Sequence, residues 1–296
     1  MRTGDAMALA TERFRAAGHA SPVVDARLLL THLLGAPHGL LMAADPTPEQ
    51  EIRFEDMIRR RESGEPVQHI TGLAHFRYEE LHVGPGVFIP RPETEQLVGA
   101  ALQILADRPA DRRRVVELCA GSGAITLCIA REMGGVELHA VELSELAWPY
   151  LVRNLDGVDV ELVAGDMADA FQQLNGTVDL VVANPPYVPE TDRSILPRDV
   201  VGQDPDLALF SGQDGQDALR VVRDVAVRLL VPGGWVAAEH DEKQSAAMLE
   251  LFGAPDFTGT VDLPDLTGRD RHIVAQRHPS HGTLRTEGRG MAGLAP

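Results

Sequence analysis

Cysteine and basic residues are both scarce in this chain of 296 residues. The two cysteines, Cys119 and Cys128, are too few for a disulfide framework or a cysteine-rich zinc site. Lysine and arginine number 27 against 44 aspartate and glutamate residues, which gives a net charge of -17. Because a chain this acidic repels a phosphate backbone unless it contains a local basic groove, general coating of DNA or RNA is disfavoured.

The chain also lacks long hydrophobic runs and a recognisable leader. Its N-terminus does not show the basic and then apolar pattern of a signal peptide. Apolar stretches such as 221–236 are interrupted by charged residues, proline or glycine, and none reaches the roughly 18 residues that suggest a membrane span. The 11 histidines follow no metal-ligand spacing. We therefore expect a soluble, cytoplasmic protein with no membrane segment and no bound metal.

Length and composition predict a globular chain of two domains. Residues 1–71 carry apolar side chains at helical spacing, and helices are expected to start at Ser21 and Thr47, each of which precedes a proline. A small helical bundle is therefore expected there. Residues 72–89 contain short strand-like segments between glycines, which predicts a hairpin-like connector. The glycine-rich, aperiodic residues 278–296 are expected to form a disordered tail.

Residues 90–277 are expected to form an α/β domain. A helix is expected to follow Pro90, and beyond Arg114 short aliphatic segments alternate with helical patterns. Strands are expected at 115–118, 137–141, 160–164, 178–183, 234–239 and 272–276. This alternation is typical of a doubly wound, mostly parallel sheet of the Rossmann-like kind.

A glycine-containing turn follows the first expected strand, in the sequence V-V-E-L-C-A-G-S-G-A-I. Ligands of open parallel sheets bind at such turns, outside the carboxyl ends of the strands. The turn differs from the G-x-G-x-x-G pattern of dinucleotide sites, because Cys119 and Ala120 precede Gly121, Ser122 and Gly123. Glu117 lies directly before the turn, where a carboxylate disfavours a phosphate and suits a cationic group. S-adenosyl-L-methionine has an amino group and a sulfonium and carries no phosphate.

Two further acids follow the next two strands. Glu142 ends the second strand, where a carboxylate commonly binds a ribose diol. Asp166 follows the third strand, in a position to reach an adenine amine. One such acid alone is often only a polar strand end. Three of them beside a glycine turn favour a nucleoside ligand.

The fourth strand ends in Asn184, Pro185, Pro186 and Tyr187. An asparagine carbonyl and a prolyl carbonyl that converge on one point can accept both hydrogens of an –NH2 group. This grip orients the nitrogen lone pair and stabilises the nitrogen as it becomes positive. The ring of Tyr187 offers a flat face to a planar amide or base. The motif therefore predicts methyl transfer to an –NH2 nitrogen.

Several stretches together resemble the protein N5-glutamine methyltransferases that modify peptide chain release factors, the HemK/PrmC family. They are E-P-V-Q-H-I-T-G (65–72), F-I-P-R-P-E-T-E (88–95), the turn 117–123, A-V-E-L-S (140–144), N-P-P-Y (184–187) and P-G-G-W (232–235). The resemblance implies a class I S-adenosylmethionine-dependent methyltransferase domain and an N-terminal domain, 1–71, that docks the release factor. The implied target is the glutamine of a Gly-Gly-Gln motif.

The resemblance also assigns residues to sites. Positions that match the family's cofactor contacts are Cys119, Ala120, Gly121, Ser122, Gly123, Glu142, Met167 and Asn184. Positions that match its substrate side are Phe88, Pro90, Arg91, Glu93 and the motif Asn184, Pro185, Pro186 and Tyr187. The chain departs from the usual G-T-G-S-G turn at Cys119 and Ala120, and it has Glu117 where Asp is commoner.

Two other functions remain open from the residues. An adenine-N6 DNA methyltransferase also uses an Asn/Asp-Pro-Pro-aromatic motif, but the acidic charge and the lack of a basic stripe oppose this alternative. A catalytically inactive methyltransferase fold that serves as a binding module is favoured only by the altered turn. The intact motif from Asn184 to Tyr187 opposes it. We therefore expect a release factor as partner and no direct nucleic-acid binding.

Overall fold

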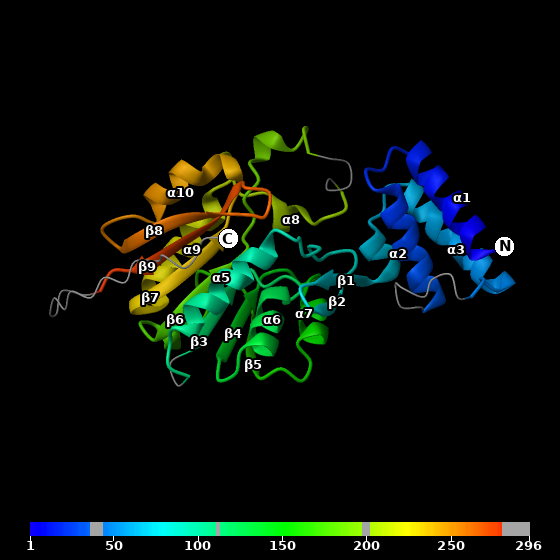
Figure 1. Ribbon diagram of the computed structural model, residues 1–296. Helices are drawn as coiled ribbons and strands as arrows, with labels where there is room; N and C mark the ends of the chain where they lie inside the picture. Colours follow the sequence, from blue (N-terminus) through cyan, green and yellow to red (C-terminus); the bar gives the residue numbers. More distant parts are fainter. Residues whose placement is uncertain (36–43, 111–112, 197–201, 280–296) are drawn as a thin grey trace. The chain divides into compact units, whose positions relative to one another are not determined.

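The computed structural model describes residues 1–35, 44–110, 113–196 and 202–279, and Figure 1 labels their elements. The chain divides into two compact units. The first contains residues 1–73 and 83–85 with the described part of 196–203, and the second contains 74–82, 86–195 and 204 onward. Across these described ranges, no helix has both the length and the hydropathy needed to cross a bilayer. The tail expected to be disordered lies, from residue 280 onward, outside the described residues.

Helices make up the first unit and confirm the expected bundle. They are α1 (Thr3–Ala16), α2 (Pro22–Leu34), α3 (Pro48–Glu62) and α4 (Val67–Thr71). The start of α3 is a capping box, in which Thr47 and Gln50 exchange side-chain to backbone hydrogen bonds. The apolar stripes of the helices meet in one core around Phe14, Leu30 and Phe54.

The second unit is built on a sheet whose described strands are ordered β5-β4-β3-β6-β7-β9-β8 (Figure 1). They are β3 (Arg114–Leu118), β4 (Glu137–Glu142), β5 (Val160–Ala164), β6 (Val178–Ala183), β7 (Leu230–Glu239), β8 (Phe257–Pro264) and β9 (Asp270–Arg277). Strands β3 to β7 pair in parallel, whereas β9 pairs antiparallel with both β7 and β8. The predicted doubly wound, mostly parallel sheet is confirmed, and β8 is an addition that the sequence analysis did not predict.

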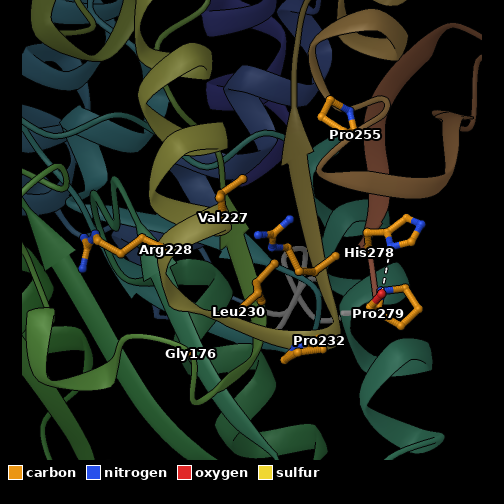
Figure 2. Close-up of a pocket in the computed structure, with 9 residues that line it drawn as sticks. Gly176, Val227, Arg228, Leu230, Pro232, Pro255, His278 and Pro279 are labelled. Atoms are coloured by element: carbon orange, nitrogen blue, oxygen red, sulfur yellow. Dashed lines mark hydrogen bonds between the residues drawn. The ribbon is translucent and has the colours of Figure 1, made fainter. Parts of the chain in front are cut away.

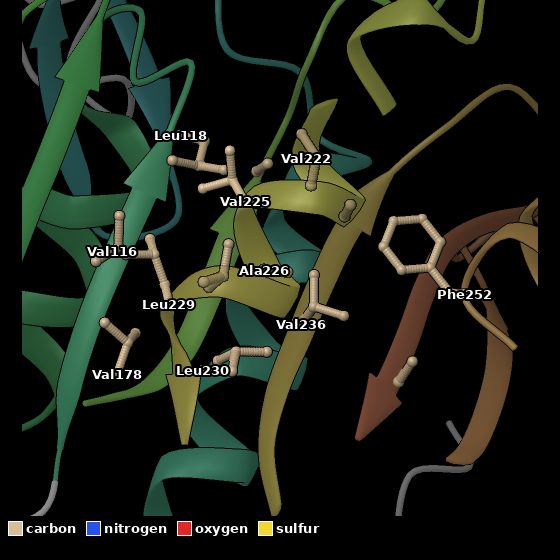
Figure 3. Packing of buried hydrophobic residues seen from close by; sticks show 14 of the residues in the cluster. Val116, Leu118, Val178, Val222, Val225, Ala226, Leu229, Leu230, Val236 and Phe252 are labelled. Atoms are coloured by element: carbon tan, nitrogen blue, oxygen red, sulfur yellow. The ribbon is translucent and has the colours of Figure 1, made fainter. Parts of the chain in front are cut away.

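Helices cover the sheet. They are α5 (Thr94–Ala106), α6 (Ala124–Glu132), α7 (Trp148–Asn154), α8 (Asp206–Leu209), α9 (Asp217–Leu229) and α10 (Ser245–Leu251), with 3₁₀ turns at Gln172–Leu174, Glu190–Asp192 and Glu242–Gln244. Figure 3 shows Val225 and Leu229 of α9 packed toward Val116 and Leu118 of β3. This core belongs to one face of the sheet. It holds the strands rigidly, so that their carboxyl ends, where the predicted site residues lie, form a fixed edge.

A small hairpin of β1 (Leu73–Phe76) and β2 (Glu79–His82) precedes the sheet. Asn154, at the end of α7, accepts a hydrogen bond from the backbone of His82 at 2.7 Å. Its amide nitrogen donates to the carbonyl oxygens of His82 and Ser122, each at 2.9 Å. One asparagine side chain therefore ties the hairpin to the glycine turn that follows β3.

Candidate active site

The turn after β3 has a left-handed backbone, which few residues other than glycine adopt readily. Cys119, Gly121 and Gly123 have φ values of 57°, 55° and 80°, all in the left-handed region. A Cβ atom at Gly123 would lie 2.9 Å from Cδ1 of Leu151 in α7, so that side chain would have to shift, and the left-handed backbone would be strained as well. The turn thus requires glycine at 123, while Cys119 adopts a conformation that costs a non-glycine residue about 1–2 kcal/mol. This cost explains why glycine is usual in the family at the position of Cys119.

Glu142, at the end of β4, holds this turn in place. Its carboxylate accepts hydrogen bonds from the backbone nitrogens of Gly121 and Ser144, each at 2.7 Å. The side chain is largely buried, and an ionised carboxylate has about four acceptor positions, so two remain for a ligand. The structure therefore brings Glu142 and the glycine turn together as expected from the order of the strands.

The two residues predicted from the third strand differ in their surroundings. Met167 places its sulfur 3.6 Å from the sulfur of Cys119, which joins it to the turn. Asp166 is exposed and accepts a hydrogen bond from the backbone of Ala168 at 2.9 Å. Carboxylates from three successive strand ends thus lie along the same edge of the sheet, and Asp166 is the most accessible of them.

Glu117 lies beneath the turn in a buried position. Its carboxylate accepts hydrogen bonds from the backbone nitrogen of Thr126, at 2.9 Å, and from the Thr126 hydroxyl. Burial raises the pKa of Glu117 to about 8, and the nearby charge of Glu142 adds to this, while the two donations from Thr126 act in the opposite direction. A cationic group placed next to Glu117 would favour its ionised form.

Cys119 is unsuited to nucleophilic chemistry. Burial raises the pKa of its thiol, and the charges of Glu142, Glu117 and Asp166 raise it further. Since the thiolate is the nucleophilic form, a thiol in this acidic and buried setting is inert near neutral pH. Cys119 acts as a small residue of the turn.

Asn184 takes part in a buried network that the sequence analysis did not predict. Strands β6 and β7 pair in parallel with Ala183 opposite Ala238, so Asn184 and Glu239 follow at neighbouring strand ends. The amide nitrogen of Asn184 donates to the hydroxyl of Thr94 at 3.0 Å, and that hydroxyl donates to Glu239 at 2.6 Å. The hydroxyl of Tyr187 donates to the other oxygen of Glu239 at 3.0 Å. The signal for Glu239 in the sequence is an acid that ends a buried strand, the same signal that identified Glu117 and Glu142.

The segment from Tyr187 onward is held in place by hydrogen bonds that involve its backbone. Gln244 donates to the carbonyl oxygen of Tyr187 at 3.0 Å, and Val188 donates to the carbonyl oxygen of Leu209 at 2.8 Å. Gly215, with φ of 73°, packs so closely that a Cβ atom there would lie 2.2 Å from the carbonyl oxygen of Tyr187. The position of Asn184 to Tyr187 is therefore determined by contacts from two later loops.

The predicted substrate-side residues form a second clamped segment. The guanidinium of Arg91 lies 5.1 Å from the centre of the Phe88 ring and pairs with the buried carboxylate of Asp204. The same carboxylate accepts a weak hydrogen bond, 3.4 Å, from the backbone of Ile89. Pro90 lies within this turn, and Glu93 immediately precedes Thr94 at the start of α5. The F-I-P-R-P-E-T-E stretch thus contains both the predicted substrate-side turn and a hydrogen-bond partner of Asn184.

A cavity of about 290 Å³ lies away from these residues. Figure 2 shows it beside Leu230, Val227 and Pro232, with His278 on its other side. Leu230 begins β7, so the cavity lies at the amino end of that parallel strand. Because ligands of doubly wound sheets bind at the carboxyl ends, the predicted active-site residues and this cavity are separate features.

Comparison with known proteins agrees with this geometry. The family model described as the PrmC N-terminal domain matches residues 5–72, and that of conserved hypothetical protein 95 matches residues 70–198. The release factor glutamine methyltransferase of Streptomyces coelicolor is 44% identical over 272 residues, which cover 92% of this chain and 96% of that protein. The chain belongs to the release factor glutamine methyltransferase family. The resemblance inferred from the sequence motifs is therefore confirmed.

One further relative and one solved structure are also similar to this chain. A 4-amino-L-phenylalanine/4-methylamino-L-phenylalanine methyltransferase of Streptomyces pristinaespiralis is 40% identical over 78% of this chain and 79% of its own length. The solved catalytic domain of hMettl16, in complex with a MAT2A 3′UTR hairpin, covers 81% of this chain and 84% of its own length. Its TM-score is 0.52 at 13% identity, so that likeness concerns the methyltransferase fold alone.

The residues present fit S-adenosylmethionine. The turn at 119–123 has left-handed glycines that leave its backbone open to a close ligand. Glu142 retains acceptor positions, and Glu117 and Asp166 add acidic groups, a set that suits a diol, an amine and a cation better than a phosphate.

Proposed function

We propose that this protein transfers a methyl group from S-adenosylmethionine to the side-chain amide nitrogen of the glutamine in the Gly-Gly-Gln motif of peptide chain release factors. Membership of the family supports the reaction and the class of substrate. The observation that carries the proposal is Asn184, held by its amide nitrogen at the carboxyl end of β6, beside the strand that leads into the glycine turn.

For the cofactor, we assign the turn from Cys119 to Gly123 to its methionine part and Glu142 to its ribose hydroxyls. Asp166 and Met167 are assigned to the adenine, and Glu117 to the cationic amino group. The bound cofactor supplies an electrophilic methyl group. The protein has to position an acceptor nitrogen in line with that group, because a neutral amide is a poor nucleophile and correct placement lowers the barrier.

For the substrate, Asn184 and Pro185 each offer a carbonyl oxygen to one hydrogen of the glutamine –NH2 group. Two such acceptors orient the nitrogen lone pair, and they stabilise the nitrogen as it becomes positive during attack. Pro186 keeps the turn rigid, and the ring of Tyr187 lies against the amide plane. Phe88, Pro90, Arg91 and Glu93 border the substrate side.

The helical unit is assigned to recognition of the folded release factor. It contains none of the predicted catalytic residues, and the PrmC N-terminal domain model matches it. Binding energy gained there would bring the Gly-Gly-Gln loop to Asn184, so that contacts outside the reacting group help to position the amide.

Mass spectrometry of a release factor after incubation with the full chain and labelled cofactor tests the proposal. We expect one added methyl group on the glutamine of Gly-Gly-Gln, and no label on a release factor whose glutamine is replaced by alanine. Parallel reactions contain 4-amino-L-phenylalanine and duplex DNA. Label on either of these acceptors, with none on the release factor, would contradict the proposal.

A further inference from the structure

We propose that Thr94 and Glu239 are positioning residues that set the direction of the Asn184 amide, with its oxygen turned toward the substrate. This inference rests on the proposed function, because it explains how that site keeps an acceptor rather than a donor facing the glutamine. The network joins three elements of the second unit: the start of α5, the end of β6 and the end of β7.

The two residues are buried where an unpartnered polar group would be costly. Thr94 is 3% exposed and Glu239 is 1% exposed. Thr94 is the first residue of α5, and no side chain caps that helix at the preceding Glu93. The Thr94 hydroxyl points to Glu239 and Asn184 instead of satisfying its own helix end. The Thr94 hydroxyl therefore joins Asn184 to Glu239 and does not cap its own helix.

The direction of each hydrogen bond follows from the number of protons available. An ionised carboxylate can only accept, so the hydroxyls of Thr94 and Tyr187 both donate to Glu239, at 2.6 and 3.0 Å. The single hydroxyl proton of Thr94 is then used, and only lone pairs face Asn184. Asn184 must present its –NH2 group to Thr94, which leaves its carbonyl oxygen for the substrate.

The surroundings of Glu239 determine whether its carboxylate is ionised and can therefore only accept hydrogen bonds. The pKa of Glu239 is raised overall, chiefly by burial and also by the charge of Glu93, while the hydroxyls of Thr94 and Tyr187 and the charge of Arg271 act in the opposite direction. Two hydroxyl donors on one carboxylate are the arrangement that stabilises the ionised form in a buried site. A flipped Asn184 would aim its –NH2 group at the substrate –NH2 group, and neither could accept.

Single-turnover methylation of the release factor by three variants of the full chain tests the inference. Thr94→Val keeps the shape of the residue and removes its hydroxyl, and we expect transfer to slow by about 10- to 100-fold, the scale found for lost supporting hydrogen bonds. Thr94→Ser restores the hydroxyl and should stay within about threefold of the original rate. Cofactor affinity should change by less than about threefold in both, a separation that loss of folding would not produce.

The matched control is Thr260→Val on β8. The hydroxyl of Thr260 is also partly buried and donates to a backbone carbonyl, that of Phe252, at 2.6 Å. We expect this variant to lose stability without a change in the transfer rate. Glu239→Gln is the second probe, because Thr94 and Tyr187 donate to different oxygens of Glu239 and glutamine replaces one of these acceptors with an –NH2 donor. It should slow transfer while leaving cofactor affinity unchanged.

Two results would overturn the inference. One is a Thr94→Val or Glu239→Gln variant that is folded and transfers at the original rate. The other is an equal loss in Thr94→Val and Thr94→Ser, which would assign Thr94 a packing role. Failure of the unaltered chain to label the release factor would instead contradict the proposed function, and the inference with it.

Discussion

At the scale of single residues, the polar side chains of the candidate site hold their surroundings with some atoms and keep others free to meet a ligand. Glu142 uses two of its acceptor positions on the turn after β3, and Glu117 uses its carboxylate on the first turn of α6. Asn184 is held through its nitrogen. Each polar side chain is thus fixed by one or two hydrogen bonds and retains another polar atom or lone pair for binding.

Replacement of Asn184 tests the proposed grip on the amide. We expect Asn184→Ala to slow methyl transfer by about a hundredfold or more, since a preorganised group that stabilises the developing charge is lost. Cofactor affinity should stay within about tenfold, or ~1.4 kcal/mol. Single-turnover assays and calorimetry measure the two quantities. Turnover close to that of the unaltered chain would refute the assignment.

Replacement of Glu142 tests the ribose assignment. We expect Glu142→Ala to weaken cofactor binding by about 1.5–3 kcal/mol, the scale of losing a charged hydrogen-bond partner. Part of this loss would come from the turn, because Glu142 also binds the backbone of Gly121. Calorimetry with the cofactor measures the effect, and Glu161→Gln on β5 is a control acid at a distance. An unchanged affinity would place the ribose elsewhere.

The raised pKa of Glu117 predicts that the stability of the protein depends on pH. Its pKa is about 8 in the folded chain against a usual value near 4.5. Between these values the folded protein keeps a proton that the unfolded chain releases, so the free energy of unfolding falls as the pH rises through this window. Glu117→Gln should therefore be less sensitive to pH than the original chain.

Denaturant unfolding at pH 5 and pH 8 measures this difference. The exposed Glu145 provides the control Glu145→Gln, which should keep the original slope. Equal slopes in all three proteins would mean that Glu117 ionises normally. Because a cation beside Glu117 favours its ionised form, cofactor binding near neutral pH should also release protons.

At the scale of elements, the carboxyl ends of β6 and β7 are brought together by parallel pairing and then clamped by loops. The Tyr187 carbonyl accepts from Gln244, at the turn before α10, and lies against Gly215, before α9. These loops contain no predicted catalytic residue. They nevertheless determine where the motif lies, so a change there should affect the chemical step.

Gly215→Ala tests this clamp. A methyl group 2.2 Å from the backbone oxygen of Tyr187 must push the motif aside, so we expect methyl transfer to fall by about tenfold or more. Gly157→Ala is the matched control, because Gly157 has a similar φ of 75° and open space around its Cβ position. Both should lose about 1–2 kcal/mol of stability from the left-handed backbone. An equal loss of transfer in both would argue against the clamp.

At the scale of the whole molecule, the chain consists of two compact units. The first is helical and pairs its own charges, as in the buried contact of Arg61 with Asp25 at 2.9 Å. The second contains all the predicted cofactor and amide-binding residues. The domain boundaries at residues 71 and 89 stay a prediction, as does the docking role of the helices.

A chain shortened to begin at Thr71 tests the docking role. We expect it to retain cofactor binding and to lose activity on the intact release factor far more than on a short Gly-Gly-Gln peptide. Circular dichroism and calorimetry confirm that the shortened chain is folded. An equal loss on both substrates would assign the helices a role in folding. Since their charges are nearly balanced, docking should depend only modestly on salt.

The sequence by itself determined the elements whose signal is local. Strands such as β6 are aliphatic apart from a single polar residue, Asp179, and the glycine turn and the Asn184 motif are short continuous segments. Their order placed them at one edge of a doubly wound sheet. Strand β8 was not predicted, because Gly259 interrupts the alternation of Phe257, Val261 and Leu263 with polar residues and most of its residues are only half-buried. It is stabilised as a strand by antiparallel pairing with β9.

Only the tertiary structure decided the partners of Asn184. Asn184 and Thr94 are 90 residues apart, and Thr94 and Glu239 are 145 apart, so no local pattern relates them. They meet because the register of β6 and β7 aligns Ala183 with Ala238 and because α5 starts above those strand ends. A carboxylate that accepts from two hydroxyls is a property of this packing, and it is the packing that turns the asparagine amide toward its partner.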